Sequence, residues 1–130
     1  MRNKIKRLSI DEAFGILTRP GLNEKLRKIK KKFHFAFIDF HNVHEMNNKL
    51  GYETVNSKFR TIFENFPFRK TDIVGRCFSG DEIIIIIFNG DIKDLINRFY
   101  KFCETLNISF DYFLKENISK KEMYDLLKHI

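Results

Sequence analysis

The chain has few cysteines and no apolar stretch of membrane length. Its two cysteines, Cys77 and Cys103, fall on a predicted strand and a predicted helix. With no signal peptide in view, we expect both to be reduced core residues rather than a disulfide or a metal site. A membrane-spanning helix needs about 20 apolar residues, and the most hydrophobic run here, residues 83–88, is far shorter. These absences predict a soluble, cytoplasmic protein with no membrane partner.

Internal repeats, linkers and low-complexity segments are also absent. The length of 130 residues predicts a single compact domain, residues 1–130, in which residues 1–8 form a loose basic N-terminus. Hydrophobic residues make up 43% of the chain and fifteen are Phe, which indicates a packed core. The abundance of Ile, Lys and Asn is typical of an AT-rich genome, as in some bacteria and phages.

The net charge of +7 favours anionic partners. The most basic run, residues 25–32, has no interleaved aromatic residues. A solvated helix face therefore explains this run better than a nucleic-acid surface, and we expect no nucleic-acid partner.

The hydrophobic periodicity predicts an α/β (α+β) fold. Helices are expected from Ser9, from Pro20, over 43–66 with a pause at Gly51, over 91–106, and from Ser119; strands are expected over 33–40, 72–78, 83–88 and 107–113. A strand, a crossover helix, a hairpin, a helix and a strand make a ferredoxin-like palm. Its central, mainly antiparallel sheet has four or five strands, and we expect the flanking helices on one side.

Two adjacent carboxylates, Asp81 and Glu82, stand at the bend of the predicted hairpin. Taken locally, Ser-Gly-Asp is ordinary turn chemistry and a solvated turn would suffice. In a palm, however, the first strand neighbours this hairpin, so Asp39 at its end would face both carboxylates. Such a set suits Mg²⁺ or Mn²⁺ and leaves ligand positions open for phosphate oxygens. The sequence therefore predicts a metal-dependent nucleotidyl-transfer site.

Three segments in order resemble the GGDEF domain, the diguanylate cyclase family. Residues 16–22 (ILTRPGL) resemble its opening Leu-Thr-Gly-Leu segment, and residues 37–52 (FIDFHNVHEMNNKLGY) resemble its first-strand motif. Residues 79–83 (SGDEI) stand at the signature itself. The resemblance covers nearly the whole chain and implies a GGDEF-like palm.

The resemblance also implies roles for the matched residues. Asp39 and Asp81 would bind the metal with the backbone carbonyl of Phe40, and Glu82 would be a further catalytic carboxylate. The residues that would contact the nucleotide are His44, Asn47, Asn56, Ser79, Gly80 and Lys128. Among these, Asn47 would contact the purine base, and Gly80 would let the backbone approach the nucleotide.

Several of these positions depart from the family pattern. His41 replaces the second Asp of the first strand, and His44 replaces a phosphate-binding Lys. Asn56 stands where the family has an acidic residue that accepts hydrogen bonds from guanine, so adenine becomes an alternative base. Ser79 replaces the first signature glycine, and Lys128 only partly replaces a second phosphate-binding Lys.

Arg69 and Asp72 have the spacing of the family's inhibitory Arg-x-x-Asp site for cyclic di-GMP. They form a candidate inhibitory site here. The alternative is a surface Arg followed by an Asp that opens a strand.

The leading functional hypothesis is an enzyme, a metal-dependent nucleotidyl cyclase that condenses purine nucleoside triphosphates, GTP or ATP, into a cyclic dinucleotide. Catalysis would need a transient homodimer. One alternative is a degenerate GGDEF-like domain that binds a nucleotide or a partner protein without turnover. Others are a minimal palm like the CRISPR-associated cyclic-oligonucleotide polymerases and a nucleic-acid-binding module.

Overall fold

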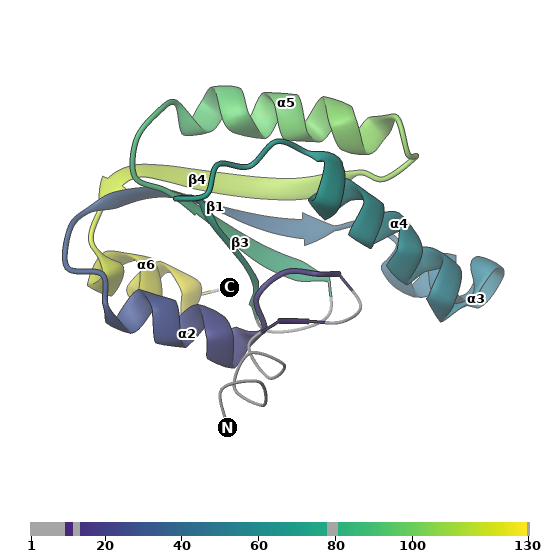
Figure 1. Ribbon diagram of the computed structural model, residues 1–130, viewed down its shortest axis with the longest axis horizontal. Coiled ribbons are helices and arrows are strands. Elements are labelled where there is room, and N and C mark those ends of the chain that lie inside the picture. The colour runs from purple at the N-terminus through teal and green to yellow at the C-terminus, as the bar shows by residue number, and fades with distance from the viewer. Residues whose placement is uncertain (1–9, 12–13, 78–80, 130) are drawn as a thin grey trace.

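A four-stranded antiparallel sheet forms the centre of the domain (Figure 1). The computed structural model describes residues 10–11, 14–77 and 81–129. The strands are β1 (Phe33–Phe40), β2 (Ile73–Arg76), β3 (Glu82–Ile87) and β4 (Phe110–Ile118), and their order in the sheet is β2-β3-β1-β4. The antiparallel palm predicted from the sequence is confirmed.

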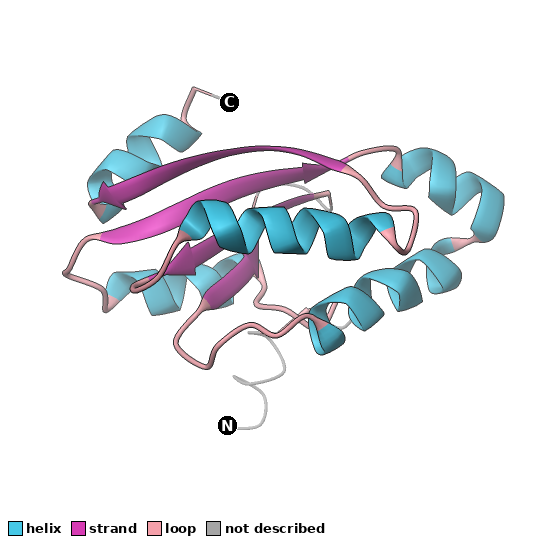
Figure 2. Cartoon of the chain, turned by 90° about the horizontal axis from the view of Figure 1, so that it is seen from above, coloured by secondary structure: helices cyan, strands magenta, loops and turns pink. Residues whose placement is uncertain are grey.

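Helices cover both faces of the sheet. Their bounds are α2 (Arg19–Arg27), α3 (Val43–Leu50), α4 (Tyr52–Asn65), α5 (Ile92–Glu104) and α6 (Lys120–Leu127). In Figures 1 and 2, α5 and α4 lie on one side of the sheet, and α2 and α6 lie on the other. Our expectation that helices flank one side only was wrong. Both alternating sets of β1 side chains are apolar, so both faces of the sheet need a cover.

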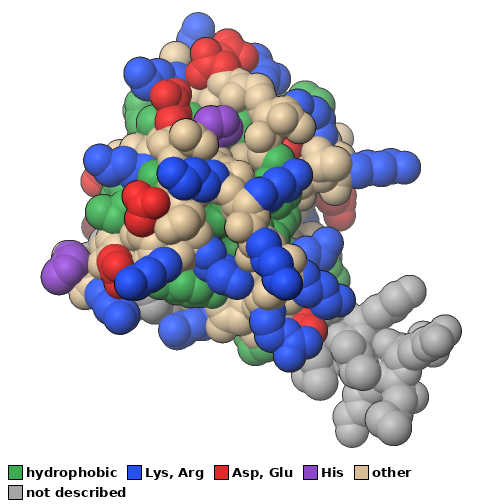
Figure 3. Space-filling view, turned by 90° about the vertical axis from the view of Figure 1, so that its left-hand side faces the viewer, with side chains coloured by type: hydrophobic (Ala, Val, Ile, Leu, Met, Phe, Trp, Pro, Cys, Tyr) green, Lys and Arg blue, Asp and Glu red, His purple; other side chains and the backbone are tan. Residues whose placement is uncertain are grey.

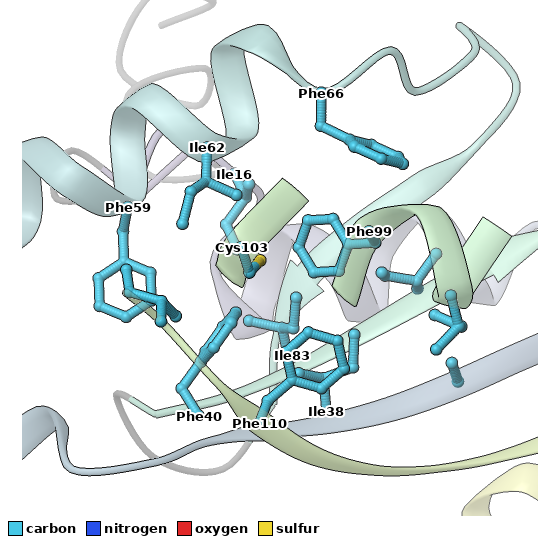
Figure 4. Packing of buried hydrophobic residues seen from close by; sticks show 14 of the residues in the cluster. Ile16, Ile38, Phe40, Phe59, Ile62, Phe66, Ile83, Phe99, Cys103 and Phe110 are labelled. Atoms are coloured by element: carbon cyan, nitrogen blue, oxygen red, sulfur yellow. The ribbon is translucent and has the colours of Figure 1, made fainter. Parts of the chain in front are cut away.

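Two hydrophobic cores result, one on each face. Ala36, Ile38 and Phe40 pack with α4 and α5, while Phe33, Phe35 and Phe37 pack with α2 and α6. Figure 4 shows part of the first core, in which Phe59, Phe99 and Phe110 converge from two helices and a strand. All five isoleucines of β3 are buried, as expected for a strand covered on both faces. Cys77 and Cys103 are both buried and neither forms a disulfide, as predicted.

The helix predicted from Ser9 is not present in the residues described there. Ser9 itself lies outside the described residues, while Ile10 forms an isolated bridge with Leu17. Gly15 has a φ of +74°, which ends any helical path. The Asp11 carboxylate accepts a hydrogen bond from the Phe14 amide at 2.9 Å, so this residue closes a turn instead of beginning a helix.

The last strand begins and ends later than predicted, at Phe110 and Ile118 rather than over 107–113. The amide of Ile108 donates to the Cys103 carbonyl, and Asn107 takes a φ of 59°. These residues therefore terminate α5 before the strand begins. The capping box predicted at Ser119 is confirmed, because its hydroxyl accepts from the Glu122 amide and the Glu122 carboxylate accepts from the Ser119 amide.

Gly75 sets the distance between β2 and α2. A Cβ at this position would lie 3.0 Å from Leu22 Cβ and 3.3 Å from Leu17 Cβ. We expect Gly75→Ala to lower the free energy of unfolding by about 1–3 kcal/mol, because overpacking forces the backbones apart. Urea denaturation measures this change, with the exposed Lys70→Ala as the control. Equal stability of the two variants would show that α2 moves aside without strain.

Candidate functional site

The end of β1 lies beside the hairpin bend, as the palm topology required. The register of β1 and β3 places Asp39 directly opposite Glu82. The amide of Phe40 donates to the carbonyl of Asp81 at 2.9 Å, which ties the bend to the strand. Directly opposed residues of antiparallel strands point to the same face. Asp39 and Glu82 therefore stand together on the face covered by α2 and α6.

A third carboxylate, Asp111, extends this row. It is the partner of Asp39 in the register of β1 and β4. The two ring nitrogens of His41 are both engaged beside it: Nδ1 lies 2.9 Å from Ser109 Oγ, and Nε2 lies 3.0 Å from Asp111 Oδ2. The imidazole is thus held by Ser109, which directly precedes β4, and by Asp111 of β4. Sequence reasoning missed Asp111 and Ser109, because only the strand register brings them to this end of the sheet.

The donor set at this end of the sheet fits a small hard cation. Asp39, Asp81 and Glu82 offer carboxylate oxygens, and Phe40 offers its backbone carbonyl. Mg²⁺ binds through one or two carboxylates and fills its other positions with water and phosphate oxygens. Among the described residues, no three His, Cys, Asp or Glu side chains are grouped to hold a metal alone. A metal ion at this end of the sheet would need further ligands, such as water or phosphate oxygens.

The predicted base-binding residues lie on the two helices after β1. In α3, the Oδ1 atom of Asn47 is buried and has no hydrogen-bond partner among the described residues. Such an acceptor costs about 1–3 kcal/mol unless a donor reaches it, and rotation of the amide would present it to a ligand. Asn56 is half-buried in α4. Ser79 and Gly80 lie outside the described residues.

The two candidate phosphate-binding side chains, His44 and Lys128, lie on, or directly after, different helices. His44 is exposed on α3, where its Nε2 lies 3.4 Å from Asn48 Nδ2. Lys128 follows the end of α6, with Nζ 4.0 Å from Asp125 Oδ1. Lys128 also lines a cavity between α2 and α6, on the same sheet face as Glu82.

Arg69 and Asp72 lie at the opposite end of the sheet from Asp39. The Asp72 side chain is 2% exposed and accepts from the Arg69 amide at 2.9 Å. The Arg69 guanidinium lies 3.5 Å from the same carboxylate and also donates to the Asn89 carbonyl. The pair therefore closes the turn before β2. Its role as an inhibitory site stays a prediction.

Arg76 anchors the N-terminal segment to β2. Its guanidinium donates to Asp11 Oδ2 at 2.5 Å and lies 4.1 Å from the centre of the Phe14 ring. The Leu17 carbonyl accepts from the Arg76 amide at 2.9 Å. Because Cys77 follows directly and its amide donates to the Glu82 carbonyl at 2.8 Å, this anchor also braces the hairpin bend.

Basic side chains gather on the end of the molecule that holds the α2–β1 connection (Figure 3). Lys25 and Lys28 are exposed there, and Lys31 Nζ lies 4.5 Å from the centre of the Phe88 ring. The carboxylate row lies at the other end of β1. Charge is therefore separated along the sheet.

Comparison with solved structures shows which fold this is. The chain is similar to the LapD S helix-GGDEF-EAL protein of Vibrio cholerae bound to c-di-GMP, with a TM-score of 0.78 and 17% identity over 98% of this chain and 34% of that one. It is also similar to the diguanylate cyclase SiaD of Pseudomonas aeruginosa, solved with its activator SiaC, with a TM-score of 0.74 and 16% identity over 98% of this chain and 57% of that one. The chain is similar as well to a sensory box/GGDEF family protein of Caulobacter crescentus, with a TM-score of 0.66 and 16% sequence identity over 82% of each chain.

The fold is thus that of GGDEF domains, which confirms the architecture implied by the sequence resemblance. The sequence identities to the three structures are only 16–17%, so the likeness is one of fold. No protein-family model and no curated protein matches the sequence. The chain spans about a third of the LapD chain and somewhat over half of the SiaD chain. No helix in the described part of the chain is long and apolar enough to cross a membrane.

Proposed function

We propose that this domain is a metal-dependent nucleotidyl cyclase that joins two purine nucleoside triphosphates into a cyclic dinucleotide. The observation that carries the proposal is the register of β1 and β3, which opposes Asp39 and Glu82 and ties Phe40 to Asp81. Two strands widely separated in sequence thus bring carboxylates to one place, in a fold shared with diguanylate cyclases.

The proposed reaction needs two domains, each of which holds one triphosphate. The 3′-hydroxyl oxygen of one nucleotide attacks the α-phosphorus of the other, the bond to the β-phosphate oxygen breaks, and pyrophosphate leaves. The same step in the other direction closes the ring, so two triphosphates give one cyclic dinucleotide and two pyrophosphates. A Mg²⁺ or Mn²⁺ ion bound here would neutralise charge that develops on the phosphates.

The chain's own residues orient the reactants in this scheme. Asp39, Asp81 and the Phe40 carbonyl would hold the metal, and Glu82 would stand beside it on the same face. Asn47 would bind the base, where its buried Oδ1 atom lacks a partner among the described residues. An amide at Asn56 both donates and accepts hydrogen bonds, so we infer that adenine is accepted as well as guanine.

A second candidate is a domain that binds a nucleotide or a partner protein without turnover. His41 favours this candidate, because an imidazole stands where diguanylate cyclases have a second carboxylate. Its two ring nitrogens already contact Ser109 and Asp111. The SiaD structure contains an activator protein, which makes a protein partner reasonable for this domain too. In this case the carboxylates would serve binding alone.

Stabilisation of the folded protein by nucleotide and metal tests binding independently of turnover. With Mg²⁺ and GTP or ATP at about 100 times the dissociation constant, we expect the free energy of unfolding to rise by about 2.7 kcal/mol. EDTA should remove most of this gain. Thermal denaturation measures it, and chromatography of the same mixtures, with Mn²⁺ in parallel, detects any cyclic dinucleotide.

The outcomes distinguish the two candidates. Stabilisation with product supports the cyclase, and stabilisation without product supports the binding domain. A folded protein that shows neither stabilisation nor product with GTP, ATP or their mixture would contradict both.

A further inference from the structure

A cavity of about 440 Å³ lies between α2, α6 and the sheet. The two helices cover the same face of the sheet in Figures 1 and 2, and Cys77 and Ile84 line the cavity from the sheet. Cavities of about 300–1,000 Å³ are typical of small-molecule sites. This volume equals that of about fifteen water molecules in the liquid.

The inner wall of the cavity is aliphatic. Its apolar lining residues are Leu22, Leu26, Ile84, Met123 and Leu127. Each of these five side chains is at least nine-tenths buried, so an alkyl chain reaches them only if α2 and α6 move apart. A wall without polar groups gives water few hydrogen-bond partners, so an apolar chain is the favoured occupant. A nucleobase is disfavoured, because its polar edge would lose hydrogen bonds there.

The outer rim of the cavity is cationic. The exposed lining residues are Arg19, Asn23, Tyr124 and Lys128, and none of the residues that line the cavity is acidic. The Asp125 carboxylate lies outside the lining, 4.0 Å from Lys128 Nζ. Burial raises the pKa of Tyr124, and the charge of Arg19 opposes this effect, so the phenol remains a hydrogen-bond donor at neutral pH. The rim therefore suits one anionic group that is attached to an apolar body.

We propose that this cavity binds an anionic amphiphile, an aliphatic monocarboxylate of medium chain length. The chain lies against the leucine and methionine side chains, and the carboxylate lies at the rim between Arg19 and Lys128. The apolar wall is separate from the residues of the proposed cyclase site, whereas Lys128 at the rim is also a candidate phosphate-binding residue of that site. Each buried methylene contributes about 0.8 kcal/mol, so affinity rises with chain length until the cavity is filled.

Decanoate is a direct probe of this site. In isothermal titration calorimetry below micellar concentrations, decanoate should bind, and decyltrimethylammonium, with the same chain and the opposite charge, should bind at least about tenfold more weakly. Butyrate should show no binding. Equal affinities for the anion and the cation would overturn the proposal.

Variants at the rim locate the binding site. Asn23→Trp places a large ring at the opening of the cavity without altering the buried wall, and should abolish decanoate binding. Arg27→Trp is the matched control, because Arg27 is exposed on the same helix but does not line the cavity. The double change of Arg19 and Lys128 to Gln should weaken decanoate binding about tenfold. Loss of binding in Arg27→Trp, or its retention in Asn23→Trp, would overturn the proposed location.

The two cysteines provide a second readout. Cys77 lines the cavity, whereas Cys103 is fully buried in the other core, where burial raises its pKa to about 12. Decanoate should slow the alkylation of Cys77 severalfold, with Cys103 unreactive throughout. If GTP with Mg²⁺ displaces decanoate and protects Cys77 equally, the cavity belongs to the nucleotide site and the separate site is refuted. If decanoate binds while GTP and ATP do not, only the proposed cyclase function fails.

Discussion

Replacing Asp39 or Asp81 with Asn is expected to reduce cyclic dinucleotide formation at least about 100-fold. A neutral amide lacks the charge with which a carboxylate holds Mg²⁺. Asp39 lies at the end of β1, and its neighbour Phe40 donates its amide to the Asp81 carbonyl at the hairpin bend. Chromatography measures the initial rate of product formation with saturating nucleotide. Circular dichroism should show that both variants remain folded.

Asp111→Asn is the matched control for this experiment. Asp111 is a third carboxylate in the same row, opposite Asp39 on β4, but its position matches no family motif. We expect its replacement to change the rate less than about tenfold, through loss of the contact with His41. Equal losses in the three variants would indicate a general effect of negative charge and would contradict a specific metal site.

Phe99→Ala is expected to lower the free energy of unfolding by about 3–5 kcal/mol. Phe99 is fully buried, and its ring centre lies 5.1 Å from that of Phe66 and 5.6 Å from that of Phe110. The ring therefore joins α5 to β4 and to the chain that follows α4, as Figure 4 shows. Urea denaturation measures the change. Such a loss is a large part of the total stability of a small domain.

Two further variants test whether this effect comes from packing. Phe99→Leu retains most of the apolar volume and should cost less than Phe99→Ala. Tyr52→Ala removes an aromatic ring that is 66% exposed and should change the stability by less than about 0.5 kcal/mol. A Phe99→Ala variant as stable as Tyr52→Ala would show that α5 repacks without the ring.

The core elements were predictable because their periodicities are strong. Alternation in 33–40 identified β1, the isoleucine run identified β3, and the apolar stripe over 91–106 identified α5. The N-terminal helix failed because the capping-box spacing at Ser9 also suits a turn. There, the positive φ of Gly15 and the partnership of Asp11 with Arg76 determine the path. The local sequence around Ser9 does not indicate the contact between Asp11 and Arg76, since Arg76 is far along the chain.

The candidate site was predictable to a similar extent. The sequence predicted that the end of β1 lies beside the hairpin, because strand order in a palm fixes that proximity, and the register opposes Asp39 and Glu82. Their role at a metal site stays a prediction. The sequence did not indicate Asp111, since it does not show how β4 aligns with β1. The cavity between α2 and α6 was missed because we expected helices on only one side of the sheet. A sheet apolar on both faces requires cover on both, and the sequence showed this before the topology was assigned.

The outer position of β4 in the sheet bears on aggregation. β4 is the outer strand on one side of the sheet, nine residues long, and no described segment pairs beyond it. An unpaired strand of this length is a template for another chain. Asn117 takes a φ of 54° and donates its amide to His34 Nδ1, which turns the end of the strand, while Asp111, Lys115 and Glu116 place charges along it. These features oppose extension of the sheet by another chain at β4.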